Sequence, residues 1–350
     1  MKVFKLLFTA AILYLIPLEN VAQNVIKIDG FVKEQKHWMD TLVLIHGIID
    51  PLYYQKPVLK VPIRGGKFEI NEDMIYPHLY FPLWESETGN VAFYPSEYFI
   101  DSTTTKIVID SLSGKVQIDG NSSLEFKNKF MPHIRDKGYA SPFEYFLADA
   151  TGYEQYLQKY SLENPDSFVA LWLVARRFSE NGHSLALEAA LKNFSKVMQS
   201  TNLWKVVGTQ ISNIEIKEGH RFPHWKLKDE NLSLVNLSFP ETKYTLVDFW
   251  FSRCLPCLEA LPEWVRVYKA YKGQGLNVVG ISVDRVEDVS LWKKRIVEKG
   301  IPWKNYLDEN GVKSFDQKIF NFPSNYLLDK EGKIIAKNIS AKELETLLKK

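Results

Sequence analysis

Residues 245–262 read TLVDFWFSRCLPCLEALP, and they give the strongest indication of the fold of the C-terminal part of the chain. It opens with an almost continuous apolar run at 245–251, which predicts a strand buried on both faces of a sheet. A helix is expected over 254–272, after a short link. A buried strand that leads directly into a helix is the first half of an alternating α/β unit.

The residues that follow continue this alternation. Short apolar runs predict further strands, and longer stretches with helical spacing of apolar residues separate them. The expected strands are 276–283, 325–329 and 333–336, and the expected helices are 287–299, 309–320 and 341–350. We therefore predict that 213–350 forms an α/β domain, with helices on both faces of a central sheet.

The first part of the chain has a different pattern. Short alternating runs separated by turn residues recur through 24–120, which predicts a β-rich domain, either a sandwich or an open barrel. Helical spacing replaces this pattern in 121–212, where Pro165 fits a helix start and Asn181-Gly182 fits a break between helices. The chain is thus predicted to be multidomain, with a β-sandwich-like domain and a small helical linker region before the α/β domain.

The N-terminus has the layout of a secretory signal peptide. Lys2 and Lys5 precede an apolar run at 6–18, and small residues follow near Ala22. The run is short for a membrane span, so residues 1–23 are expected to be removed, leaving a mature chain without a transmembrane span. The predicted location is the periplasm or cell envelope, and tethering to the inner membrane by an uncleaved segment is the alternative.

The balance of charge excludes some classes of partner. The chain carries 44 basic and 42 acidic side chains, and the formal net charge of +2 gives no basic surplus for nucleic acid. No Gly-rich phosphate loop or dinucleotide fingerprint stands out. We therefore predict no cofactor and no nucleic-acid partner.

The chain contains two cysteines, Cys254 and Cys257. Exported proteins use cysteine mostly in structural disulfides, but a bridge across so short a loop adds little stability, so the pair is better placed for thiol–disulfide exchange. Cys254 opens the predicted helix, whose N-terminal N–H groups stabilise a thiolate, and Arg253 adds positive charge. Cys254 is the expected nucleophile and Cys257 the resolving cysteine. Pro256 is tolerated between them, because the first helical turn does not need its N–H.

Asp248 is the second chemical signal. It lies within the apolar strand, where a carboxylate is costly unless it has a partner or a task. Burial should raise its pKa towards neutrality, so that it can take and return the proton of Cys257. An ordinary buried aspartate with satisfied hydrogen bonds is the alternative.

Two other uses of the cysteines were weighed. A closed zinc site needs four ligands, and His220 and His224 are the histidines whose spacing would complete one. They lie about thirty residues upstream across a strand, and a surface loop is their plainer interpretation, so no metal site is predicted. Peroxiredoxins carry Pro and Thr or Ser seven and three residues before the reactive cysteine. Val247 and Phe251 stand there before Cys254, which argues against peroxidase activity.

The segment VDFWFSRCLPCLEALP resembles the active-site segment of thioredoxins, in the TlpA/ResA-like branch of exported thiol-disulfide oxidoreductases. The resemblance implies a thioredoxin-like fold for 213–350, a redox disulfide Cys254–Cys257, and a helix kinked at Pro262. In NFPSNYLLDKEGKII (321–335), Pro323 would be the cis-proline beside the disulfide, and the backbone of Phe322 would pair with an extended substrate. Arg253 and Trp250 complete the expected substrate-binding set, and Pro256 joins Pro262 as a structural residue. More weakly, 24–212 looks like the β-rich domain and helical linker that precede such thioredoxins in Bacteroidetes-type proteins.

Three residues depart from the pattern of that branch. Arg253 stands where Trp usually precedes the first cysteine, and Ala260 stands where a glutamate often follows the second. Glu259 is one position away, which on a helix is about 100° around the axis. Phe322 is bulkier than the residue that usually precedes the cis-proline. Proton handling therefore rests more on Asp248, and the substrate groove should have a different shape.

The sequence therefore predicts an exported thiol-disulfide oxidoreductase that acts on exported proteins with disulfides or thiols. Leu255-Pro256 between the cysteines resembles the reducing members, and a reductase of this kind needs an electron-donating membrane partner. Two alternatives stay open. One is an envelope binding protein whose thioredoxin module serves docking or redox sensing, and the other is a role restricted to cytochrome c maturation.

Overall fold

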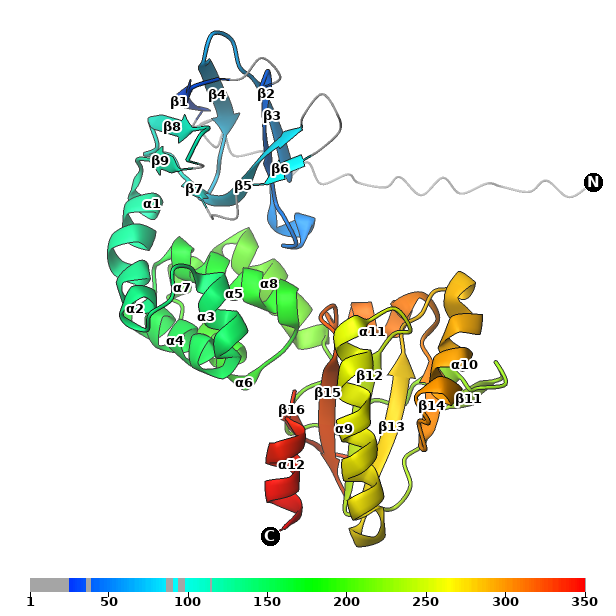
Figure 1. Ribbon diagram of the computed structural model, residues 1–350. Coiled ribbons are helices and arrows are strands. Elements are labelled where there is room, and N and C mark those ends of the chain that lie inside the picture. Colours follow the sequence, from blue (N-terminus) through cyan, green and yellow to red (C-terminus); the bar gives the residue numbers. More distant parts are fainter. Residues whose placement is uncertain (1–24, 36–38, 86–90, 94–97, 114, 350) are drawn as a thin grey trace, which may run out of the picture.

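The computed structural model describes residues 25–35, 39–85, 91–93, 98–113 and 115–349, so the predicted signal peptide lies outside the described residues. Two sheets form the N-terminal β region, followed by a helical region and a C-terminal sheet flanked by helices (Figure 1). Among the described residues, no helix has the length and apolar character needed to cross a membrane.

The N-terminal β region contains one sheet in the order β4-β1-β8-β9 and a second in the order β3-β2-β5-β6, with β7 paired to β5. Strand β1 shows why these residues form a sandwich: alternate side chains from Ile26 to Val32 point inward and the others face solvent. The strands are β1 (Val25–Lys33), β2 (Thr41–Ile45), β3 (Val58–Pro62), β4 (Lys67–Asp73), β5 (His78–Glu85), β6 (Val91–Phe93), β7 (Tyr98–Ile100), β8 (Lys106–Asp110) and β9 (Val116–Ile118). A short 3-10 helix, η1 (Pro51–Tyr53), follows β2.

The helical region begins directly after β9. Its elements are α1 (Asn121–Glu125), the π-helical turn η2 (Phe126–Phe130), α2 (Met131–Asp136), α3 (Pro142–Ala148), α4 (Ala150–Glu163), α5 (Phe168–Asn181), α6 (Leu185–Lys192), α7 (Lys196–Ser200) and α8 (Asn202–Asn213). Hydroxyl side chains cap many of these helices; Ser167, for example, accepts from the N–H of Ala170 at the start of α5. One hydrophobic cluster runs from Ile26 to Ile214, so the β region and the helices share a core.

The C-terminal sheet has the order β11-β10-β14-β13-β12-β15-β16. Its strands are β10 (Lys226–Lys228), β11 (Leu234–Asn236), β12 (Tyr244–Trp250), β13 (Leu276–Ser282), β14 (Lys304–Leu307), β15 (Ser324–Asp329) and β16 (Ile334–Lys337). Strand β12 is central, parallel to β13 and antiparallel to β15. Its last six residues are all buried, which explains the apolar run in the sequence.

The helices of this domain are α9 (Leu255–Tyr271), α10 (Val289–Glu298), α11 (Val312–Asp316) and α12 (Ala341–Leu348), with 3-10 turns η3 (Lys272–Gln274), η4 (Val286–Asp288) and η5 (Glu309–Gly311). Helices α9, α10 and α12 contribute side chains to the core on one face of the sheet. Most of the other face is covered by irregular segments within 216–239, together with Ile319. The sequence pattern predicts helices on both faces, so this face differs from the expectation.

The helix predicted at 309–320 is much shorter in the structure. The backbone takes positive φ at Asn310, Gly311 and Lys318, which confines the α-helix between them to Val312–Asp316. Residues 317–322 therefore form a connecting segment that leads to Pro323. Strands β10, β11 and β14 were not foreseen, because their three or four residues are too few to show a period.

Candidate active site

The end of strand β12 and the start of helix α9 bring the two cysteines together. Cys254 is the N-cap residue of α9, and its Sγ accepts a hydrogen bond from the backbone N–H of Cys257 at 3.2 Å. The N–H of Cys254 donates to the carbonyl of Phe251 at 3.0 Å, which closes the turn between strand and helix. Pro256 lies in the first turn of α9, and Pro262 lies inside the helix.

A disulfide joins Cys254 and Cys257. The two cysteines are 4% and 3% exposed, so in this oxidised state they do not differ in exposure. They do differ in their backbone environment. The sulfur of Cys254 lies at the helix N-terminus and receives an N–H, an environment that favours a thiolate.

Asp248 lies on the same face of β12 as Leu246 and Trp250, which pack in one cluster with both cysteines. It is 4% exposed, and burial raises the pKa of its carboxyl group to about 7. Its Oδ1 is buried and has no hydrogen-bond partner in the part of the chain that the structure describes. The carboxyl group can therefore exchange a proton near neutral pH.

A second buried acid, Asp284, anchors the loop before Cys254, and sequence reasoning missed it. Its carboxylate accepts from the Ser252 N–H at 2.9 and 3.1 Å and from the Ser252 hydroxyl at 2.5 Å. The hydroxyl of Ser282 also donates to it at 2.5 Å. Burial raises the pKa of Asp284, while these donors oppose that rise. A signal was present, since Asp284 lies two residues after the end of β13, the strand next to β12, and parallel strands have their carboxyl ends at one sheet edge.

The side chain of Arg253 forms an ion pair with Asp288, a partner that the sequence did not indicate. Its Nε and Nη2 donate to Asp288 Oδ1 at 2.9 and 2.7 Å, and the guanidinium is largely exposed. The carboxylate of Asp288 therefore offsets part of the positive charge expected beside Cys254. Arg253 stays at the surface next to the pair, where it is available for contact with a protein substrate.

The other expected substrate-binding residues differ in accessibility. The Phe322–Pro323 bond is cis, Pro323 is exposed, and the ring of Phe322 meets that of Phe251 edge-on with centroids 5.5 Å apart. Trp250 is instead 1% exposed within the core cluster of the cysteines. Its ring therefore packs in the core beside Cys254 and Cys257 and offers no surface to a substrate.

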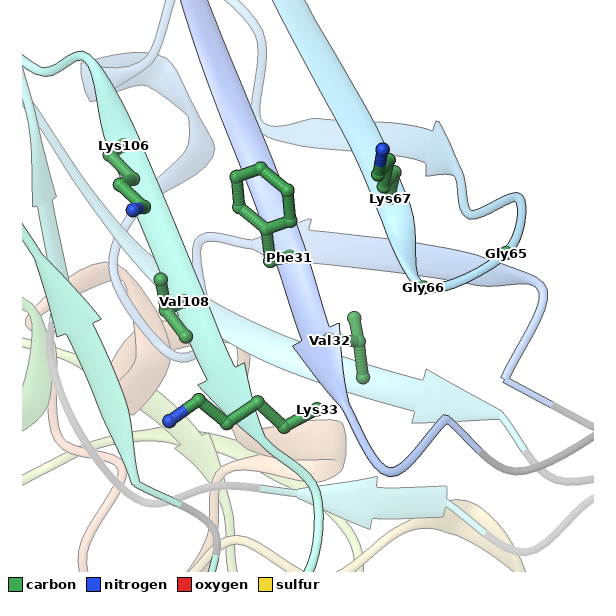
Figure 2. Close-up of a pocket in the computed structure, with 8 residues that line it drawn as sticks. All are labelled: Phe31, Val32, Lys33, Gly65, Gly66, Lys67, Lys106 and Val108. Atoms are coloured by element: carbon green, nitrogen blue, oxygen red, sulfur yellow. The ribbon is translucent and has the colours of Figure 1, made fainter.

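A separate hollow of about 400 Å³ lies on the outer side of the sheet formed by β1, β4 and β8 (Figure 2). Lys33, Lys67 and Lys106 line it together with Phe31, over whose ring the Lys106 ammonium lies at 5.4 Å. Its lining includes no cysteine, histidine or carboxylate. It therefore offers none of the groups needed for thiol exchange or acid–base chemistry.

The structure also places the histidines of the rival zinc interpretation. The carbonyl of His220 accepts from the N–H of Ile334 on β16, which ties this histidine to the edge strand of the sheet. No group of three or more His, Cys, Asp or Glu side chains suited to a metal ion occurs within the described ranges.

Comparison with known proteins concerns the C-terminal part of the chain. Residues 219–337 match the AhpC/TSA family. The thiol-disulfide oxidoreductase ResA of Bacillus subtilis is 27% identical over 120 residues, which make up 34% of this chain and 66% of that protein, slightly less than two thirds. ResA of Bacillus thuringiensis is 26% identical over 135 residues, covering 38% of this chain and 77% of the relative.

Solved structures match the same region. The thioredoxin domain of a thiol-disulfide oxidoreductase from Bacteroides vulgatus is 34% identical, with a TM-score of 0.34, and the match covers 38% of this chain and 96% of that one. A thiol:disulfide interchange protein from a Bacteroides species is 33% identical, with a TM-score of 0.34, over 39% of this chain and 90% of the other.

Proposed function

Because residues 219–337 form a thioredoxin-like domain that belongs to the AhpC/TSA family, we propose that this chain is an exported thiol-disulfide oxidoreductase acting through Cys254 and Cys257. The observation that carries the proposal is the disulfide at the N-terminus of α9, on the sheet face that also holds the buried acid Asp248. A short-range bridge at a helix N-terminus adds little stability and is well placed for exchange. Its substrates are exported proteins with disulfides or thiols.

The first step uses the reduced form of the protein. The Cys254 thiolate attacks one sulfur of a substrate disulfide, and a bond forms between Cys254 Sγ and that sulfur. The substrate disulfide breaks, and its second sulfur leaves as a thiolate that takes up a proton. The N–H of Cys257 and the N-terminus of α9 favour this step because they stabilise the attacking thiolate.

In the second step Cys257 resolves the mixed disulfide. Its thiol gives a proton to Asp248, and the resulting thiolate attacks Cys254 Sγ. The bond between Cys254 and the substrate breaks, and the substrate sulfur leaves as a thiolate. Asp248 returns the proton to this thiolate. The substrate has then gained two electrons and two protons, and the protein holds the Cys254–Cys257 disulfide seen in the structure. A pKa near 7 suits Asp248 for both transfers.

The reducing direction requires a donor that returns two electrons to the disulfide. We propose a membrane-bound dithiol partner outside the cytoplasm for this role. The sequence supports the direction through Pro256 between the cysteines, which resembles reducing relatives. The exposed cis-proline Pro323 and the surface guanidinium of Arg253 are the groups offered to the substrate.

The reduction potential of the pair tests the proposal. The mature protein is titrated in thiol/disulfide buffers, and a two-electron transition near about −250 mV is expected for a reductant. A value near about −120 mV would instead make it an oxidant. The Cys257→Ser variant should accumulate mixed disulfides through Cys254, whereas Cys254→Ser should form none. If the native protein shows no two-electron transition, the exchange function is excluded.

A further inference from the structure

The segment that leads to the cis-proline, residues 317–322, is held in place by the N-terminal part of the chain. Asn321 Nδ2 donates to the carbonyl of Glu180 at the end of helix α5, at 2.7 Å. Lys318 Nζ lies 2.9 Å from Asp50 Oδ2, and both side chains are mostly buried. The conformation of this segment therefore depends on residues more than a hundred positions away in the sequence.

Further hydrogen bonds hold both sides of the junction between residues 317–322 and the N-terminal part of the chain. Gln317 Oε1 accepts from the backbone N–H of Glu215 at 2.6 Å and of Ile216 at 3.1 Å. On the other side, Asp50 also accepts from Gln210 Nε2 at 3.0 Å. Because each side is held by several hydrogen bonds, the junction has a defined shape that can serve recognition.

A pocket of about 220 Å³ lies at this junction. Two parts of the chain line it: the turn after β2 together with the end of α5, and the segment before Pro323. The residues that matter here are Ile48, Asp50, Pro51, Ser179, Lys318 and Phe320. Ile48 and Phe320 are 68% and 44% exposed, so the pocket has apolar side chains available to solvent. Its volume lies below the roughly 300–1,000 Å³ of typical small-molecule sites, so a single side chain is the better fit.

One residue of the pocket lining, Phe320, lies close in sequence to Pro323 at the proposed exchange site. Phe320 precedes Pro323 by three residues, which in an extended chain span at most about 10 Å. The ring of Phe322 meets that of Phe251, and the carbonyl of Phe251 accepts from the N–H of Cys254. A polypeptide that lies along the cis-proline segment can therefore reach the pocket while one of its sulfurs meets Cys254.

We propose that this pocket is a specificity site of the exchange reaction, which takes an apolar side chain of the substrate protein a few residues from the attacked cysteine. This inference rests on the proposed function. The occupant is an extended segment of a disulfide-bearing polypeptide, continuous with the stretch bound at Phe322 and Pro323. Asp50 and Lys318 already neutralise each other, and the Nδ1 of His46, which also lines the pocket, is hydrogen-bonded to the carbonyl of Ile49, so the pocket selects for apolar surface and not for charge. The N-terminal β region thereby gains a role in substrate choice.

The test uses the mature full-length protein and two kinds of disulfide. The first is a set of peptides whose single cysteine is joined to glutathione, with one phenylalanine moved stepwise away from the cysteine, or replaced by aspartate. The second is oxidised glutathione, which has no large apolar side chain to place in the pocket. The variants are Ile48→Asp and Phe320→Asp, and Leu112→Asp is the control because Leu112 is 73% exposed in the turn after β8.

The native protein should prefer phenylalanine at one or two positions over aspartate. Both pocket variants should lower kcat/KM for the preferred peptides about ten-fold or more, which corresponds to losing the burial of one apolar side chain. Their kcat/KM for oxidised glutathione should stay unchanged, and Leu112→Asp should match the native protein on both. Equal losses on peptides and glutathione, or no loss on either, would overturn the specificity site. A native protein that reduces neither disulfide refutes the proposed function, and the specificity site with it.

Discussion

The buried charges Arg176 and Arg177 of the helical region have acidic partners, whereas Asp248 in the C-terminal domain has no partner of opposite charge among the described residues. In the helical region, Arg177 is 1% exposed and its Nε donates to Glu154 at 2.7 Å. Arg176 and Glu180 form a second buried pair at 2.7 Å. In the C-terminal domain, Asp248 is buried to a similar degree, but no basic side chain pairs with it among the described residues, and burial is what moves its pKa.

This difference distinguishes charges that hold a fold from charges that are available for chemistry. A paired buried charge keeps its ionisation state, and removing one partner mainly costs stability. A buried carboxylate without a partner has its pKa moved to neutrality, where it can exchange protons at working pH. The comparison therefore predicts separate effects for substitutions in the two regions.

The largest effect on stability should come from breaking the buried pair. Glu154→Gln leaves the Arg177 guanidinium buried without its counter-charge, which should lower the free energy of unfolding by about 3–5 kcal/mol. Urea unfolding followed by circular dichroism measures this loss. Glu163→Gln is the matched control on the same helix, because its pair with Lys159 is exposed and 3.7 Å long. Similar unfolding midpoints for the two variants would contradict the distinction.

Asp248→Asn should act in the opposite direction on stability. The unfolded carboxyl group ionises near its ordinary pKa of about 4, whereas the folded one ionises near about 7. The native protein therefore loses stability as pH rises between these values, and the asparagine variant does not. Three pKa units correspond to about 4 kcal/mol, so the variant should be more stable by up to that amount at pH 8 and similar at pH 4.

The same variant separates stability from activity. Because the amide introduced by Asp248→Asn cannot accept the proton of Cys257, resolution of the mixed disulfide should slow in this variant although its fold is more stable. Stopped-flow measurement of the resolution step across pH 5–9 would show this. An unchanged rate would remove Asp248 from the mechanism, and an unchanged pH dependence of stability would contradict its raised pKa.

The smallest effect should come from the exposed ion pair beside the cysteines. Arg253→Ala removes a positive charge near Cys254, so the pKa of this thiol should rise slightly and the reduction potential should become slightly more negative. The free energy of unfolding should not change measurably, because the pair is exposed. Ultraviolet titration of the thiolate measures the pKa shift. Arg285→Ala is the control, and an equal shift there would show a general charge effect.

Local patterns in the sequence were sufficient for much of the fold and part of the site. The apolar run ending at Trp250 is a buried strand, the following helix begins at the cysteines, and the region 24–120, expected to be β-rich, contains strands β1 to β9. These features depend on residues a few positions apart, whose spacing reports burial directly. The cis geometry of Phe322–Pro323 agrees with the family resemblance and was not deducible from spacing.

Other features depended on contacts between distant segments. Asp284 and Ser252 are 32 residues apart, and only the parallel pairing of β12 with β13 brings the loop and the acid together. Trp250 was expected among the substrate contacts, but the core that packs around it hides its ring. Short strands such as β14 carry too few residues for a period to be read.

Cys254, Cys257 and the acid Asp248 in the strand before them could be recognised from the sequence as the candidate groups for exchange. Local order was enough to recognise them, because a strand, a turn and a helix start can be read from residues a few positions apart. Their surroundings follow from the folded chain instead: Asp284 anchors Ser252, and Asp50 pairs with Lys318 beside the segment that leads to Pro323. Such contacts join segments that are far apart along the chain, and their geometry follows from packing, which a one-dimensional pattern does not contain.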